Sequence, residues 1–323
     1  MGVDILLLGL GQTGASVGLA LGRSGSEFRR TGYDPDMDVA RAAHKAGAVD
    51  RLTSDPRRES RTADLIFFNL SSATRGLALE AVASDLKNGA VLIDMTPLKR
   101  SALEAIPARL AAGAAFVGAV PILGADRVFQ PDAPQASGDL FQDGLLALVL
   151  PPGTVPEAVE VCTDLAVLLG ARPFFLDAAE LDAANAASEA LPMVLAAAYL
   201  RSLAASPAWR DQGRLAARAF EGLTRLAALR PPADLAQDLA ANRSNVLRWI
   251  DAFLGELGDL RELVAQADSE SLRRPFEDAV LVYQSWKVNR LQDKGESAAP
   301  LPPMSTGSAL ARMLGLRRSL PPR

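Results

Sequence analysis

The chain has 323 residues, of which 49% are hydrophobic and 22% charged, and this composition is ordinary for a globular protein. The formal net charge of −4 provides no basic stripe for nucleic acid, and no apolar run approaches the roughly 20 residues that cross a bilayer. We therefore expect neither a nucleic-acid binder nor a membrane protein. The single cysteine, Cys162, excludes an internal disulfide, and no export signal precedes the first apolar run, so we expect a cytoplasmic protein.

Seven short, β-rich apolar runs recur through the first half of the chain, and helical stretches rich in Ala and Leu separate several of them. The runs are VDILLLG, EFRRTGYD, ADLIFFNL, GAVLIDM, AAFVGAV, LLALVL and ARPFFLD. Strands that alternate with helices are typical of a parallel sheet covered on both faces. The pattern predicts an α/β, doubly wound, Rossmann-type domain over residues 1–176.

The second half contains no strand-like run. Ala- and Leu-rich segments continue to about residue 291, with expected breaks at SPAW, RPPAD and RRPF. The clearest helix carries apolar residues at steps of four and three, which places them on one face: Val246, Ile250, Phe253, Leu257, Leu260 and Val264. We predict an all-helical substrate and dimerisation domain over residues 177–291, followed by a mobile Pro-, Gly- and Ser-rich tail over 292–323.

The strongest local signal is LLLGLGQTGASVGLAL, which follows the first strand. Gly9, Gly11 and Gly14 fit the pattern G-x-G-x-x-G, in which the glycines allow a tight turn, approach of a pyrophosphate and close packing of helix and strand. Asp34 ends the second strand twenty residues after Gly14, where a carboxylate can accept hydrogen bonds from an adenosine ribose. Because its charge repels a 2′-phosphate, we predict NAD as cofactor, with NADP less favoured.

We also assign Gln12, Thr13 and Ser71 to the cofactor site, since they belong to the Gly-rich turn or follow a strand of the same sheet. Another nucleotide, such as S-adenosylmethionine, is the alternative ligand for this half.

The order of several motifs resembles the prephenate and arogenate dehydrogenases of tyrosine biosynthesis over about residues 3–265. These motifs are GLGQTGASVGLAL, GYD, ADLIFFNL, GAVLIDMTPLK, FVGAVPILG, SGDLF, LDAANAASEALPMVLAAA and AFEGLTRLA. The resemblance implies a Rossmann domain, a helical dimerisation domain and, in the cleft between them, NAD(P)-dependent oxidative decarboxylation of a cyclohexadienyl acid. It also implies a homodimer that binds a small-molecule carboxylate.

Carried over residue by residue, the resemblance is incomplete. In GAVLIDMTPLK, Asp94 and Lys99 match the family, whereas Pro97 stands at the position of a Ser that orients the catalytic His, with Thr96 beside it. The family carries that His in GxHPMxG, which we expect to form a substrate loop, and here GAVPILG has Val120 in its place.

The substrate-domain motif SHLPH of the family corresponds here to EALPM, so that Ala190 and Met193 replace both histidines. The arginine that grips a substrate carboxylate in the family corresponds to Arg225 in LTRLA. The one histidine of the chain, His44, follows the second strand, and we expect it on a surface helix near the adenosine end.

Three interpretations stay open at this point. The first is a dehydrogenase of this family with altered substrate or reduced activity, in which Arg225 binds a carboxylate and Lys99 or Thr96 assists proton transfer. The second is a β-hydroxy-acid dehydrogenase, supported by IDMT and AVPILGA but opposed by the lack of lysine over residues 178–200. The third is a non-catalytic protein in which bound NAD regulates assembly or a partner. We expect no metal.

Overall fold

The computed structural model describes residues 2–24, 28–71, 74, 76, 78–79, 82–130 and 135–292. The described chain forms two compact units. The first contains the residues up to Ala178 together with Trp286–Gln292, and the second is Ala179–Ser285. Residues 293–323 of the predicted tail lie outside the described residues, and the predicted domain boundaries stay predictions.

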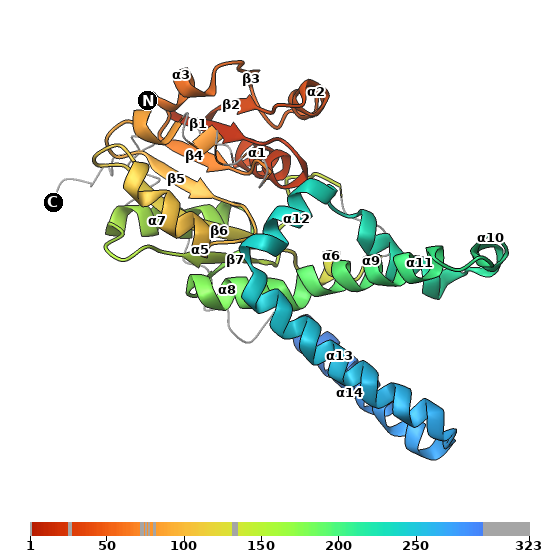
Figure 1. Ribbon diagram of the computed structural model, residues 1–323. Coiled ribbons are helices and arrows are strands. Elements are labelled where there is room, and N and C mark those ends of the chain that lie inside the picture. The colour runs from red at the N-terminus through yellow and green to blue at the C-terminus, as the bar shows by residue number, and fades with distance from the viewer. Residues whose placement is uncertain are drawn as a thin grey trace. The chain divides into compact units, whose positions relative to one another are not determined.

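The first unit is built on an eight-stranded sheet with the order β3-β2-β1-β4-β5-β6-β7-β8 (Figure 1). The strands are β1 (Val3–Leu8), β2 (Phe28–Tyr33), β3 (Arg51–Leu52), β4 (Leu65–Phe68), β5 (Val91–Asp94), β6 (Ala115–Ile122), β7 (Leu145–Val149) and β8 (Arg172–Phe175). The seven predicted strands are present, and the order is that of a Rossmann-type domain, as predicted. The two-residue strand β3 gave no signal in the sequence.

The sheet is mostly parallel, as expected, with one antiparallel pair of strands. Strand β7 runs antiparallel to β6, and β8 is parallel to β7. The segment between β6 and β7 contains only one short described helix, α6 (Ala125–Val128), so the chain returns along β6 instead of crossing over to a parallel position.

Helices cover both faces of this sheet. The described helices of the unit are α1 (Gln12–Arg23), α2 (Met37–Lys45), α3 (Pro56–Ser60), α5 (Arg100–Ala105), α6, α7 (Pro156–Leu168) and the short 3-10 turns η1 (Ala83–Asp85) and η2 (Pro107–Arg109). Successive side chains of β1 point to opposite faces of the sheet. Ile5 and Leu7 belong to the core cluster that includes residues of α1, α2 and α7. Leu6 and Leu8 belong to the cluster on the other face, with residues of η1 and α5. Such fully buried strands explain the continuous apolar runs in the sequence.

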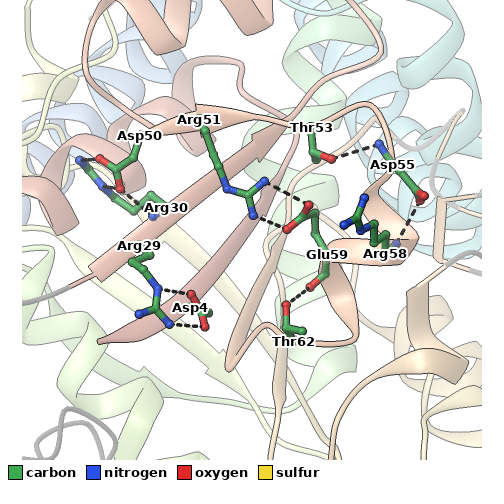
Figure 2. Close-up of polar contacts among 10 residues, drawn as sticks. All are labelled: Asp4, Arg29, Arg30, Asp50, Arg51, Thr53, Asp55, Arg58, Glu59 and Thr62. Carbon is green, nitrogen blue, oxygen red and sulfur yellow. Dashed lines mark hydrogen bonds and ion pairs between the residues drawn. The ribbon is translucent and has the colours of Figure 1, made fainter. Parts of the chain in front are cut away.

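Charged pairs join the first strands at the edge of this sheet (Figure 2). The guanidinium of Arg29 on β2 forms a bidentate ion pair with the carboxylate of Asp4 on β1, with N···O distances of 2.6 and 2.5 Å. Arg30 pairs with Asp50 at 2.6 Å, and the guanidinium of Arg51 on β3 pairs with Glu59 on α3. The Arg29 guanidinium holds the pKa of Asp4 below its ordinary value.

The second unit is helical, as predicted. Its elements are α8 (Ala178–Asn185), a π-helical turn η3 (Ala186–Ala190), α9 (Leu191–Ala204), α10 (Trp209–Gln212), η4 (Gly213–Leu215), α11 (Arg218–Thr224), η5 (Arg225–Ala228), α12 (Pro232–Ala241), α13 (Arg243–Gln266) and α14 (Ser269–Gln292), of which the end from Trp286 onward belongs to the first unit. The expected break at RRPF was wrong. Pro275 lies inside α14, and the chain turns earlier, at Ala267 in the left-handed region and Asp268, which caps α14.

Few side chains of the second unit are buried. Its core cluster consists of Ala186, Ala190 and Val246, with Leu239 and Ile250 packed against them. The other apolar residues of α13 and α14 include many large exposed side chains, namely Leu247, Trp249, Leu254, Leu257, Val264, Phe276, Val280, Leu281, Val282 and Tyr283. Among the described residues, none of the helices combines the length and apolar character that membrane crossing requires.

Candidate functional site: a dinucleotide turn and a helical charge cluster

The Gly-rich turn between β1 and α1 has the shape of a phosphate cradle. Gly9 adopts a φ of +92°, and a Cβ there would collide with the backbone of Asn69, which follows β4. A Cβ at Gly14 would collide with the carbonyl oxygen of Gly9. A Cβ at Gly11, in contrast, would meet nothing within 4 Å. Two glycines therefore let protein segments touch, and the third leaves open space in front of the first turn of α1.

That first turn suits a negatively charged group. Gly11 is the N-cap of α1, no acidic side chain lies in the first turn, and the helix dipole there favours anions. The residues present at the turn thus fit a dinucleotide pyrophosphate.

Asp34 follows the end of β2 and is tied to the same turn. Its carboxylate accepts hydrogen bonds from the backbone N–H of Leu10 at 2.7 Å and from that of Asp36 at 2.9 Å. These bonds fix the carboxylate beside the Gly-rich turn, and a carboxylate with about four acceptor positions keeps capacity for a ribose hydroxyl. His44 lies exposed on α2, which follows directly.

The three further residues assigned to the cofactor site lie near these elements. Gln12 and Thr13 form the first turn of α1. Ser71 lies just beyond β4, and its hydroxyl is 3.2 Å from that of Thr74. Asn69, which touches Gly9, was missed by the sequence reasoning, although a polar residue directly after a buried strand is the signal that could have found it.

The structure brings Asp94, Thr96 and Lys99 together after β5. The Lys99 side chain is fully buried, and its ammonium donates to the Asp94 carboxylate and to the Asp94 carbonyl, each at 2.9 Å, and to the Thr96 carbonyl. The Thr96 hydroxyl donates to the Asp94 carboxylate at 2.8 Å. The three N–H bonds of the ammonium are thus directed at protein oxygens, which favours a supporting role over direct contact with a substrate. Catalysis by Lys99 or Thr96 stays a prediction.

Most of GAVPILG is strand, and the expectation of a loop was wrong for this part. Strand β6 continues through Ile122, and Val120 pairs with Ala147 of β7. The register with β5 ends at Gly118, so the following residues of β6 are paired by β7 alone. An edge position of this kind tolerates Pro121, which has no N–H to donate.

Residues from the end of α14 hold the segment that follows β6. Arg290 donates to the carbonyl oxygen of Leu123 at 2.5 Å. Trp286 packs edge-to-face on Phe129, with ring centroids 5.3 Å apart, and the Lys287 ammonium lies 5.5 Å from the same ring centroid. The sequence reasoning missed these contacts, because nothing in the chain order relates α14 to β6.

Arg225 begins η5, which packs against α9 in the second unit. Its side chain is half-exposed, and its guanidinium pairs with the Glu221 carboxylate at an N···O distance of 3.7 Å. Arg230, a few residues further, pairs with Asp238 on α12 at 2.5 Å. Ala190 is buried at the end of η3 and Met193 is buried on α9, so the two positions that replace histidines contribute to the core of this unit.

Glu189 lies in the π-helical turn η3, directly before Ala190, and the sequence reasoning gave it no role. Protein around it displaces water from the carboxylate and raises its pKa, while the positive charge of Arg230 acts in the opposite direction. The residue is nevertheless exposed to solvent, so the displacement of water is incomplete. Perturbed carboxyl groups and π-helical turns both occur often at functional sites. Among the described residues, no group of three or more His, Cys, Asp or Glu side chains could hold a metal ion.

A parallel βαβ unit with a Gly-rich turn, followed by a helical unit, places this chain in the class of proteins with a Rossmann-type dinucleotide-binding fold. Two family profiles match it: "Prephenate dehydrogenase, nucleotide-binding domain" over residues 17–174 and "Prephenate dehydrogenase, dimerization domain" over residues 177–278. The chain belongs to the prephenate dehydrogenase family.

Individual relatives agree with this assignment. Prephenate dehydrogenase of Bacillus subtilis (strain 168) is 27% identical over 279 residues, which cover 85% of this chain and 74% of that protein. The crystal structure of prephenate dehydrogenase from A. aeolicus in complex with hydroxyphenyl propionate and NAD+ superposes with a TM-score of 0.76 and 20% identity, over 88% of this chain and 98% of that one. Synechocystis arogenate dehydrogenase gives a TM-score of 0.67 and 22% identity, over 88% and 100% of the two chains. The structural matches confirm the fold.

Proposed function

We propose that this protein is an NAD-dependent dehydrogenase that oxidatively decarboxylates a cyclohexadienyl acid, prephenate or arogenate. The observation that carries the proposal is the joint presence of a phosphate-cradling Gly turn and a helical domain that both match one dehydrogenase family. NAD, when bound, supplies the hydride acceptor, and loss of carbon dioxide then makes the substrate ring aromatic.

The residues of this chain have separate tasks in the proposal. Gly11 and the first turn of α1, with Gln12 and Thr13, hold the pyrophosphate, and Ser71 lies beside the cofactor. Asp34 accepts a hydrogen bond from the adenosine ribose and repels a 2′-phosphate, so NAD is preferred to NADP. Arg225 binds a substrate carboxylate.

Thr96 and Lys99 keep a proposed role in proton transfer, through the network that they form with Asp94 after β5. Val120 occupies the position of the family's catalytic His. A general base typically contributes about 10²–10⁴ in rate, whereas positioning of the reacting groups can contribute about 7–11 kcal/mol. We therefore expect a slow enzyme rather than an inactive one.

We also propose that the protein is a homodimer joined through its helical domain and acts in the cytoplasm. The support is the match to the family's dimerization domain and the exposed apolar side chains of α13 and α14.

Steady-state assays with NAD and each of the two acids test the proposed activity. NADH should form with at least one acid, and Arg225→Ala should raise KM strongly, with a smaller change in kcat. Arg214→Ala, which removes an exposed arginine of η4, is the matched control and should leave KM unchanged. Tight NAD binding without turnover of either acid would overturn the proposal in favour of a regulatory protein.

A further inference from the structure

The last residues of α14, Trp286–Gln292, belong to the first unit, unlike the rest of that helix. Two side chains of this end contact the chain that follows β6. The guanidinium of Arg290 donates to the Leu123 carbonyl oxygen at 2.5 Å, and the Trp286 ring packs edge-to-face on Phe129. Both residues lie beyond residue 278, where the match to the family's dimerization domain ends, so the family assignment gives no reason for these contacts.

The segment that these contacts hold, residues 119–129, is called the β6 extension. Strand β5 ends at Asp94, whose partner in β6 is Gly118, so the extension runs past the carboxyl end of β5. The Gly-rich turn follows the carboxyl end of β1, which is parallel to β4 and through it to β5. Open α/β sheets bind ligands outside the carboxyl ends of their parallel strands, so the extension lies at the ligand-binding edge, and residues 120–122 are partly exposed there.

The β6 extension has little regular structure of its own. Its strand residues pair with β7 alone, and its helix α6 has four residues, fewer than a helix needs for stability without tertiary contacts. Toward the start of β7 the backbone is closely packed, since a Cβ at Gly124 would lie 2.5 Å from the carbonyl oxygen of Gln142. The end of α14 contacts the extension at Leu123, just before α6, and at Phe129, just after it, and thus supports both ends of this short helix.

We propose that Arg290 and Trp286 are positioning residues, which fix the β6 extension at the carboxyl end of the sheet in the geometry that the reaction requires. The inference rests on the proposed function. Arg290 acts through a backbone carbonyl and therefore sets the path of the main chain, and neither residue acts on the substrate itself. Catalysis is sensitive to such placement, because a displacement of about 1 Å can cost about 10²-fold in rate.

The experiment measures kcat, KM and the dissociation constant of NAD in the parent protein, Arg290→Ala, Arg290→Lys and the control Arg274→Ala. The control removes an exposed arginine from the same helix. We expect Arg290→Ala to lower kcat at least about tenfold, with KM and NAD affinity within about twofold of the parent, since the Gly-rich turn is intact. Arg290→Lys can still donate to the Leu123 carbonyl and should recover most of kcat, while Arg274→Ala should change none of the three values.

The aromatic contact is tested by a second pair of variants. Trp286→Ala removes the ring and should also lower kcat, whereas Trp286→Phe keeps a ring beside Phe129 and should retain most of it. An equal loss of kcat in both variants would contradict the role assigned to this contact.

Three results with Arg290→Ala would overturn the inference. The first is an unchanged kcat. The second is a rise in KM alone, which would place Arg290 in substrate binding. The third is a joint loss of NAD affinity and thermal stability, which would indicate a general structural role.

Hydrogen exchange separates this inference from the proposed function if neither acid is oxidised. Backbone amides of the β6 extension should exchange at least about tenfold faster in Arg290→Ala than in the parent or in Arg290→Lys, while the amides of β1 exchange as before. Such a local rise would show that Arg290 fixes the extension even in a protein without this activity. Unchanged exchange in the extension, or faster exchange throughout the first unit, would overturn the inference.

Discussion

The two units of this chain differ in how much of their apolar surface they bury. In the Rossmann unit, alternate residues of the central strands pack under helices on both faces, and large side chains such as Phe67 and Phe68 are fully buried. In the helical unit, the core cluster is small, and large apolar side chains of α13 and α14 stay exposed. The first unit is complete within one chain, whereas the second requires another surface to bury its apolar face.

The largest effect is expected inside the Rossmann unit, at its buried ion pair. Lys99→Met removes one partner and leaves the Asp94 carboxylate, which is 0% exposed, without its cation. Loss of one member of a buried pair typically costs about 3–5 kcal/mol, and chemical denaturation should show a loss of this size. The double variant Lys99→Met with Asp94→Leu should recover part of it. A loss below about 1 kcal/mol would contradict the account of this pair.

The next effect concerns the helical unit. Leu257→Asp and Val282→Asp place a charge on the exposed apolar faces of α13 and α14, where burial of one such side chain contributes about 1.5–3 kcal/mol. Light scattering should show a dimer for the parent and monomers for both variants. Val155→Asp, at an equally exposed apolar position of the Rossmann unit, is the control and should stay dimeric. Unchanged dimers in all three would mean that the dimer uses another surface.

A third pair of variants separates folding from cofactor binding within one turn. Gly14→Ala collides with the backbone of Gly9 and should destabilise the Rossmann unit by about 1–3 kcal/mol. Gly11→Ala meets no protein atom, so its stability should match that of the parent while NAD affinity falls at least about tenfold. Thermal unfolding and calorimetric titration measure the two properties. Full NAD affinity in Gly11→Ala would show that the pyrophosphate does not approach this glycine.

The smallest effect is expected at the exposed pairs of Figure 2. Arg29 holds the pKa of Asp4 below its ordinary value of 3.8, so the pair stabilises the fold above that pH and the contribution is lost as the pH falls through the lowered pKa. Because both side chains are partly exposed, Arg29→Gln should cost at most about 1 kcal/mol at pH 7. Denaturation curves of the two proteins should converge in acid. A difference that grows in acid would contradict the assignment.

Sequence patterns predicted the Rossmann unit well, because its buried strands and the Gly-rich turn leave local signals. They failed where distant segments decide the structure. The antiparallel strand β7, the contact of Arg290 with Leu123 and the partners of Lys99 all depend on segments that meet only in the fold. At RRPF the pattern misled, because Pro275 is accommodated inside a long helix.

In the candidate site, too, the sequence predicted the residues that give a local signal and missed those whose surroundings depend on the fold. The glycines and Asp34 could be found from spacing alone, since the turn and its acidic partner belong to one βαβ unit. The buried network of Lys99 with the Asp94 carboxylate and the Thr96 carbonyl could not, because the local sequence does not reveal that this lysine is fully buried.

The central claim is that this chain carries out an oxidation coupled to decarboxylation with NAD as hydride acceptor. The most direct test measures NADH and the aromatic product together while arogenate or prephenate is consumed by the purified protein. The account predicts that NADH and the aromatic product appear in equal amounts, at a rate proportional to protein concentration. Aromatic product without NADH, or consumption of neither acid by a protein that binds NAD, would contradict it.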